Sequence, residues 1–176
     1  ARILGLGATT SAVGDGGVTV AQRLKMPVTT GRSLAVGFAV EALKQAADER
    51  GLELGEATAA VVGASGTVGL AMAEMLAPLV RKLILVGQRE IRVSQARAQA
   101  EAAGASEVRV WTEIEPLVEA DIVVTATSAY HPIVGPDALK RGALVCDIAV
   151  PADVTEAVRK TRPDVELING TMVQMP

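Results

Sequence analysis

From residue 57 onward, short apolar runs alternate with longer stretches that carry apolar residues at helical spacing. The runs predict strands over 57–62, 82–86, 107–111, 121–126, 143–147 and 165–168. The intervening stretches predict helices over 67–77, 90–103, 113–118, 136–140 and 153–160. Strands that alternate with helices favour a doubly wound α/β fold. Its parallel sheet is expected to have the Rossmann strand order 3-2-1-4-5-6.

The first 32 residues are glycine-rich and show no such alternation. We expect a short strand over 2–6 and a short amphipathic piece over 18–25 within them. This segment is interpreted as the remnant of an adjoining, substrate-binding domain. The dinucleotide-binding domain is then expected over residues 33–176.

A long helix is predicted over 34–50. Ser33 is a plausible N-cap, and Gly51 is a natural C′ residue just after the helix. The apolar stripe of this helix is expected to consist of Phe38, Ala39, Ala42, Leu43 and Ala46.

The turn after the first strand of the alternating region reads Gly63-Ala64-Ser65-Gly66-Thr67-Val68-Gly69. Gly63 would allow a tight turn, and Gly66 would let a pyrophosphate approach the backbone closely. Gly69 would let the following helix pack against the strand, so that the positive end of the helix faces the phosphates. All seven residues are therefore predicted to bind a dinucleotide. The alternative is a tight strand–helix turn that binds nothing.

The second strand of this region ends at Gly87-Gln88-Arg89. A site for the unphosphorylated cofactor usually has an acidic residue here, which bonds the ribose hydroxyls. No Asp or Glu ends this strand, whereas the guanidinium of Arg89 can bind a 2′-phosphate through two parallel hydrogen bonds. Gln88 and Arg89 are therefore predicted to contact the cofactor and to favour NADP(H) over NAD(H). Alternatively, Arg89 is a solvated residue at a helix start.

Small hydroxyl residues close the fourth strand, at Thr125-Ala126-Thr127-Ser128. They can contact the cofactor ribose without blocking it, although Ser and Thr are also ordinary turn residues at strand ends. Thr125, Ala126 and Thr127 are included in the predicted cofactor site because ligands bind at the carboxyl ends of strands in this fold.

Two titratable residues near these strand ends are candidate catalytic groups. His131 is the only histidine of the chain, and near a nicotinamide it could exchange a proton, or it is an exposed and inert loop residue. Asp147 ends the fifth strand, where it could bond a ribose, orient a substrate, or cap the turn toward Pro151. Cys146, the only cysteine, lies inside an apolar run and is interpreted as a core residue rather than a nucleophile.

A candidate substrate site precedes the long helix. Arg32 could hold an anionic group, and the hydroxyls of Thr29 and Thr30 could bond a carbonyl. The same residues are equally compatible with a turn and a helix cap.

Composition narrows the functional classes. The chain has 176 residues, is 49% hydrophobic but only 2% aromatic, and carries a net charge of −3. We therefore expect no nucleic-acid binding, no polybasic anchor, no membrane span and no metal site. A single cysteine suits the reducing cytoplasm. The sequence starts at Ala1 without Met and ends at Pro176 without a polar tail, as expected for part of a longer protein. The oligomeric state is left open, and a homo-oligomer is one possibility.

The motifs together resemble the shikimate/quinate dehydrogenase-like dinucleotide domains. They occur in the same order: Thr29-Thr30-Gly31, the glycine turn, Thr125–Ser128, Cys146–Pro151 and Asn169–Val173. Within that group, the pattern most resembles the long-chain fatty acyl-(acyl-carrier-protein) reductases, which make fatty aldehydes with NADPH. The resemblance implies that Ile148 and Gly170 also belong to the cofactor site. Arg32 stands where those reductases usually have Asn, and Cys146 does not match their acyl-accepting cysteine.

These observations predict an NADP(H)-binding oxidoreductase domain that reduces a fatty acyl thioester or a related carbonyl. Its substrate partner is then a small molecule or an acyl carrier. One alternative is an alcohol dehydrogenase of the shikimate or quinate type. The other is a nucleotide-binding regulatory module that turns nothing over.

Overall fold

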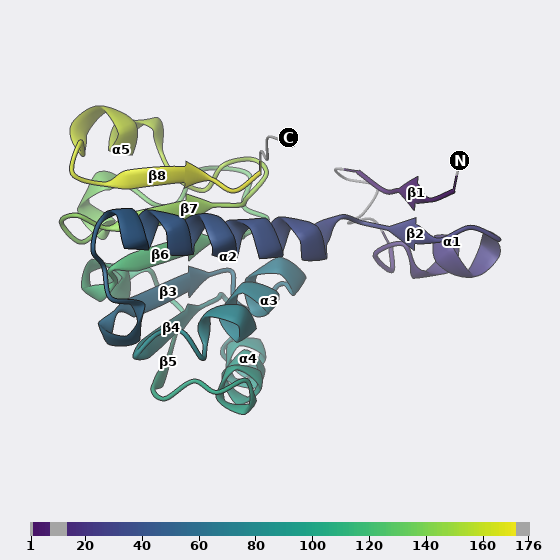
Figure 1. Cartoon of the computed structure of the whole chain (residues 1–176), viewed down its shortest axis with the longest axis horizontal. Helices are drawn as coiled ribbons and strands as arrows, with labels where there is room; N and C mark the ends of the chain where they lie inside the picture. Colours follow the sequence, from purple (N-terminus) through teal and green to yellow (C-terminus); the bar gives the residue numbers. More distant parts are fainter. Residues whose placement is uncertain (1, 8–13, 172–176) are drawn as a thin grey trace. The chain divides into compact units, whose positions relative to one another are not determined.

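The computed structural model describes residues 2–7 and 14–171 (Figure 1). The chain forms two compact units, Ala1–Ala35 and Val36–Pro176. The smaller unit contains β1 (Leu4–Gly5), α1 (Val18–Arg23) and β2 (Val28–Thr29). β1 and β2 pair in parallel, with Leu4 opposite Val28. The interpretation of the first 32 residues as a substrate-domain remnant stays a prediction.

The long helix α2 (Arg32–Glu49) starts two residues earlier than expected. Ser33 is its second residue, so the prediction of an N-cap there is wrong. The expected end is confirmed: Gly51 has a φ of 65°. The N–H of Gly51 donates to Asp48 O at 3.0 Å, and that of Leu52 to Ala47 O at 2.8 Å, which closes the helix with left-handed backbone after its last turn.

The buried face of α2 is rotated relative to the predicted stripe. Phe38 is 36% exposed and Ala42 is half-buried. The buried residues are Val36, Ala39, Val40, Leu43, Ala46 and Ala47. Apolar residues surround most of this helix, so spacing alone does not determine which of them face the sheet.

The larger unit is built on one parallel sheet, whose strands agree closely with the predicted ones. They are β3 (Thr58–Val62), β4 (Lys82–Val86), β5 (Val108–Trp111), β6 (Ile122–Thr125), β7 (Leu144–Asp147) and β8 (Glu166–Asn169). Their order is β5-β4-β3-β6-β7-β8, and each neighbouring pair is parallel. The predicted Rossmann order is confirmed. Successive strands are added on one side of β3 up to β5 and on its other side from β6 onward. The strand order therefore reverses between β3 and β6, which is where this fold binds ligands.

The helical segments differ more from expectation. α3 (Thr67–Leu76) and α4 (Glu90–Ala102) are regular, but the segments expected over 113–118 and 136–140 are 3₁₀ turns, η3 (Glu115–Glu119) and η4 (Pro136–Ala138). Another 3₁₀ turn is η2 (Leu54–Glu56), and the last helix is α5 (Glu156–Thr161). Among the described residues, no helix is long and apolar enough to cross a bilayer.

Each face of the sheet has its own apolar core. On one face, Val61, Leu85 and Val124 pack with residues of α2, α3 and α4. On the other, Val62 and Val145 pack with residues of η3, η4 and α5. Alanine and valine make up most of the buried apolar residues in the described chain.

Candidate functional site

The turn between β3 and α3 lies at the point where the strand order reverses. Gly63 has a φ of 84°, in the left-handed region. Its N–H and that of Ala64 donate to Val86 O at 2.9 and 3.1 Å, which ties the turn to β4. A Cβ on Gly63 would lie 2.6 Å from Ala126 O, so the turn packs directly against the end of β6. The predicted tight turn at Gly63 is therefore present.

Ala64 and Gly69 are the residues of the motif that pack toward the protein interior. Ala64 is fully buried in the core. A Cβ on Gly69 would lie 2.2 Å from Gly63 O, so only glycine lets α3 approach the turn this closely. The more exposed residues of the motif are Gly66 and Thr67. Gly66 is the N-cap of α3 and provides no side-chain cap, so the first backbone N–H groups of the helix are available to an anion.

The end of β4 lies next to this turn. A Cβ on Gly87 would lie 3.2 Å from Ser65 Oγ. Gln88 and Arg89 follow and are exposed, and Arg89 is the N-cap of α4. Arg92, which is also exposed, lies one turn further along α4. Within the described residues, neither arginine forms an ion pair with a carboxylate, so both guanidinium groups are available to an anion.

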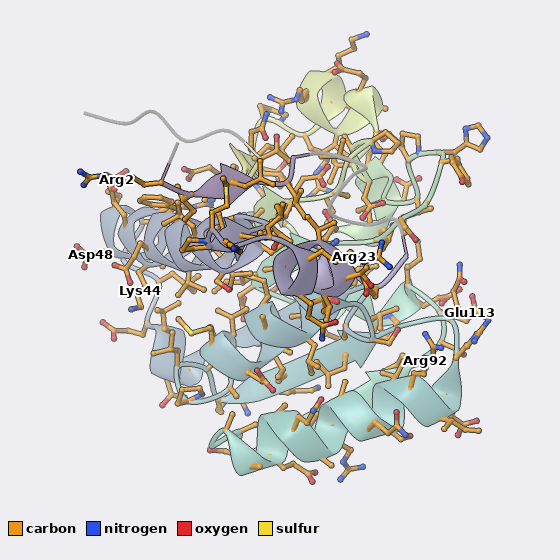
Figure 2. All side chains as sticks on the ribbon, turned by 90° about the vertical axis from the view of Figure 1, so that its right-hand side faces the viewer. Arg2, Arg23, Lys44, Asp48, Arg92 and Glu113 are labelled. Atoms are coloured by element: carbon orange, nitrogen blue, oxygen red, sulfur yellow. The ribbon has the colours of Figure 1, made fainter. Side chains whose placement is uncertain are left out.

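Figure 2 views the molecule from the side toward which β3 and β8 point in Figure 1. It labels Arg92 on α4 and Glu113, which follows β5, on the right-hand side of this view. Trp111, the last residue of β5, is 43% exposed, and its carbonyl accepts a hydrogen bond from the N–H of Gly87 at 3.1 Å. The ends of β4 and β5 are thus joined by a backbone hydrogen bond beside the arginines.

Asp147 caps the loop after β7. Its Oδ1 accepts hydrogen bonds from Thr125 Oγ1 at 2.9 Å and from the N–H of Ala149 at 3.0 Å. Its Oδ2 accepts a hydrogen bond from the N–H of Val154 at 3.1 Å. Of the roles considered for Asp147, this geometry is that of the turn cap. Thr125 is fully buried, and its hydroxyl is used in the same cap.

Thr127 is held by a second carboxylate, Asp153, which is fully buried. Oδ2 of Asp153 accepts a hydrogen bond from the N–H of Thr127 at 3.0 Å, and Oδ1 accepts one from its hydroxyl. Burial raises the pKa of Asp153, hydrogen bonds from Thr127 oppose that rise, and the charge of Asp147 adds to it. The sequence predicts a helix that begins at Asp153, but this residue lies in the loop before α5.

Ile148 and Gly170, which the resemblance assigns to the cofactor site, directly follow β7 and β8 and lie close to each other. A Cβ on Gly170 would lie 2.7 Å from Ile148 Cγ1 and 3.0 Å from Cys146 Sγ. Cys146 is fully buried, and burial, followed by the charge of Asp147, raises the pKa of its thiol to about 12. Such a thiol is inert at neutral pH, in agreement with the prediction of a core cysteine.

The remaining candidates lie on loops. His131 is exposed, in the segment after β6. In the smaller unit, Thr29 Oγ1 accepts a hydrogen bond from the N–H of Gly31 at 3.2 Å, and Thr30 Oγ1 accepts one from the N–H of Arg32 at 3.5 Å. These are the local bonds of a turn that leads into α2. A substrate role for the three residues stays a prediction.

Sequence reasoning did not select two residues of this region, Arg92 and Asp153. Arg92 follows Arg89 by three residues, which is the spacing of neighbours on a helix, so helical spacing could have identified it. Asp153 and Thr127 are 26 residues apart, and no local pattern links them.

Comparison with known proteins identifies the family. Residues 44–169 match the family described as shikimate / quinate 5-dehydrogenase. The chain therefore belongs to this family, and it is an NAD(P)-binding domain of the oxidoreductase type.

Solved structures with a similar fold include glutamyl-tRNA reductase from Methanopyrus kandleri. That match has a TM-score of 0.61 and 29% identity, and it covers 76% of this chain and 34% of the other. Shikimate 5-dehydrogenase from Listeria monocytogenes, in complex with shikimate and NAD, has a TM-score of 0.58 at 15% identity, over 78% of this chain and 52% of the other. At that identity the likeness shows the fold alone.

A curated relative, the aminotransferase PigE of Serratia sp., is 29% identical over 177 residues, which is 98% of this chain and 20% of that protein. This chain thus spans about a fifth of the length of that relative. The wider family resemblance is confirmed. None of the relatives named here bears the name of a fatty acyl reductase, so the narrower relationship stays a proposal.

Proposed function

We propose that this chain is the NADP(H)-binding domain of a reductase that acts on an activated acyl carbonyl, such as a fatty acyl thioester. The observation that carries the proposal is the glycine turn at the reversal point of the sheet. There the uncapped start of α3 and the close contact of Gly63 with Ala126 leave backbone N–H groups at the position where a pyrophosphate binds in this fold.

The residues present fit a phosphorylated cofactor. A Cβ on Gly66 would lie only 3.3 Å from Gly63 O, so any side chain here would crowd the cradle that a pyrophosphate would fill. Arg89 and Arg92 would hold the 2′-phosphate, because both are exposed cations in the first turn of α4, which follows β4, and no carboxylate ends that strand. When bound, the nicotinamide supplies hydride to the carbonyl carbon.

The chain contributes position and electrostatics to this reaction. The caps formed by Asp147 and Asp153 fix the loops after β6 and β7, which border the crevice on the side away from the arginines. Both carboxylates are occupied by hydrogen bonds, so we assign them no proton transfer. Hydride addition to a thioester carbonyl is followed by cleavage of the C–S bond, which gives the aldehyde, and the proton taken up by the departing thiolate would come from a group other than these two carboxylates.

The choice of an acyl carbonyl rests on the resemblance and on one relative. The Methanopyrus kandleri protein is a reductase of glutamyl-tRNA, which is an activated acyl ester, and thioesters belong to the same chemical class. The family match itself favours a second candidate, an alcohol dehydrogenase that acts on a hydroxy acid of the shikimate or quinate type.

Cofactor choice is tested by Arg89→Asp. We expect this change to weaken NADPH binding about ten- to a hundredfold, since a charge-assisted phosphate contact contributes about 1.5–3 kcal/mol, and to affect NADH much less. Arg97→Asp is the matched control. It makes the same charge change on α4, about 12 Å along the helix, where Arg97 pairs with Glu101 at 2.7 Å.

Both affinities can be read from energy transfer between Trp111, the only tryptophan, and the bound nicotinamide. A wild-type preference for NADH, or equal losses for both cofactors in Arg89→Asp, would refute the NADP(H) assignment. Oxidation of NADPH with acyl thioesters, and not reduction of NADP⁺ with hydroxy acids, is the outcome expected of the whole protein.

A further inference from the structure

We propose that Asp153 is a positioning residue for the nicotinamide half of the cofactor site, acting through Thr127. This inference rests on the proposed function, since it assigns a task within the same dinucleotide crevice. Asp153 belongs to the loop between β7 and α5, whereas Thr127 belongs to the loop after β6. The carboxylate therefore joins the two loops that border one half of the crevice.

These two loops are joined by hydrogen bonds between Asp153, which is fully buried, and Thr127, which is half-buried. Both oxygens of Asp153 accept from Thr127, one from the backbone N–H and one from the hydroxyl. Thr127 Oγ1 in turn accepts a hydrogen bond from the N–H of Ala129 at 3.1 Å. The backbone carbonyl of Asp153 accepts from the N–H groups of Ile133 and Val134 at 2.8 and 2.9 Å. Residues 127–134 are thus held at both ends by one residue.

The position of Thr127 is transmitted to the phosphate turn. Ala126, its neighbour, donates its N–H to Val62 O at 2.9 Å. The carbonyl oxygen of Ala126 lies 2.6 Å from the point that a Cβ on Gly63 would occupy. Thr127 Cγ2 lies 3.1 Å from the same point. Because these atoms leave no room for even one methyl group at Gly63, a shift of Thr127 would move the wall of the turn on the β6 side.

The β4 side of the crevice is held by hydrogen bonds that involve neither Asp153 nor Thr127. The turn is tied to β4 through Val86 O, and β4 to β5 through Trp111 O. Asp153 is bound to neither. Loss of its carboxylate should therefore disturb the nicotinamide half of the site and spare the half that would hold 2′-phosphoadenosine.

The test compares an intact cofactor with its adenosine half, using the full chain. Affinities for NADPH and for 2′,5′-ADP are measured by calorimetry, well below the unfolding temperature. In Asp153→Ala we expect NADPH binding to weaken about tenfold or more, since the N–H and the hydroxyl of the half-buried Thr127 both lose their acceptor. Binding of 2′,5′-ADP should change less than about twofold.

Asp153→Asn should restore NADPH binding to within about threefold of wild type. Its carbonyl oxygen can accept from the N–H of Thr127, and its amide can donate to the Thr127 hydroxyl, which has a second lone pair. Thr127→Val, which removes only the hydroxyl, should give an intermediate loss. Thr127→Val also serves as the test if Asp153→Ala does not fold. In that case, equal losses of affinity for NADPH and 2′,5′-ADP in Thr127→Val would refute the proposal.

Asp164→Ala is the matched structural control. Asp164 also bonds a loop N–H, that of Gly142 at 2.9 Å, but before β7 and not after it. We expect it to lower the unfolding temperature and to leave both affinities unchanged. A folded Asp153→Ala protein that binds NADPH normally, or loses both ligands equally, overturns this inference alone. A wild-type chain that binds neither ligand overturns the proposed function, and this inference with it.

Discussion

Replacing Gly63 by alanine tests the central contact of the candidate site. The change adds one methyl group to a residue whose φ is 84°, where an L-residue costs about 1–2 kcal/mol. The new Cβ would also lie 2.6 Å from the carbonyl oxygen of Ala126 and 2.8 Å from its carbon. Backbone atoms cannot move aside as a flexible side chain does, so overpacking adds about 1–3 kcal/mol. We expect a total loss of about 2–5 kcal/mol.

Gly51→Ala separates the two contributions. Gly51 has a similar φ of 65°, but a Cβ there would meet no atom within 4 Å. This variant should lose only the conformational cost of about 1–2 kcal/mol. The difference between the two variants is then the steric cost of placing a methyl group between the phosphate turn and the end of β6.

Urea unfolding followed by far-ultraviolet circular dichroism gives both free energies of unfolding. Gly63→Ala should be less stable than Gly51→Ala by at least about 1 kcal/mol. Equal losses in the two variants would show that the turn does not pack on Ala126, and the close contact between the phosphate turn and β6 would be refuted.

Three further outcomes are expected. Gly66→Val should abolish NADPH binding in a folded protein, because its Cβ would lie 3.3 Å from Gly63 O, which requires a shift of only a few tenths of an ångström, while the branched side chain would occupy space that the pyrophosphate needs; a folded variant with unchanged affinity would contradict the cofactor assignment. Cys146 should react very slowly with thiol reagents at pH 8, where a thiol with a pKa of about 12 is only about one part in ten thousand ionised, and an acyl adduct on it after incubation with a thioester would refute its structural role. Arg162 lowers the pKa of Asp164 below its ordinary value of 3.8, so this carboxylate stabilises the fold above about pH 4 and its contribution is lost as the pH falls further. Asp164→Asn should therefore lower the unfolding temperature at pH 7 and lose less relative to wild type at pH 2, whereas a constant difference would contradict the pairing.

The strands could be predicted because parallel strands covered on both faces are continuous apolar runs. Lys82–Val86, for example, is buried at every residue, and its predicted and observed bounds agree. The buried face of α2 could not be predicted in the same way, since small apolar residues surround the helix. Segments 113–118 and 136–140 are too short for their spacing to separate an α-helix from a 3₁₀ turn.

In the candidate site, too, local features could be predicted from the sequence and long-range contacts could not. Its glycine turn and the arginine after β4 are local features, and their residue types alone indicate the chemistry. The caps formed by Asp147 and Asp153 depend on partners 22 and 26 residues away. Such contacts arise only once β6 and β7 pair, so the sequence shows the acidic residues but not what they hold.

A core made mostly of alanine and valine has a consequence for how this protein tolerates mutation. Shortening Val61 or Val124 to alanine removes two carbon atoms, whereas truncating a leucine to alanine removes three, so the cavity left is smaller. Enlarging a buried alanine is a different matter: Ala60 and Ala73 have no exposed surface, and added atoms there must push whole layers apart. Random mutagenesis should therefore find truncations widely tolerated and enlargements selectively eliminated, the reverse of what a core rich in large aromatic side chains would give.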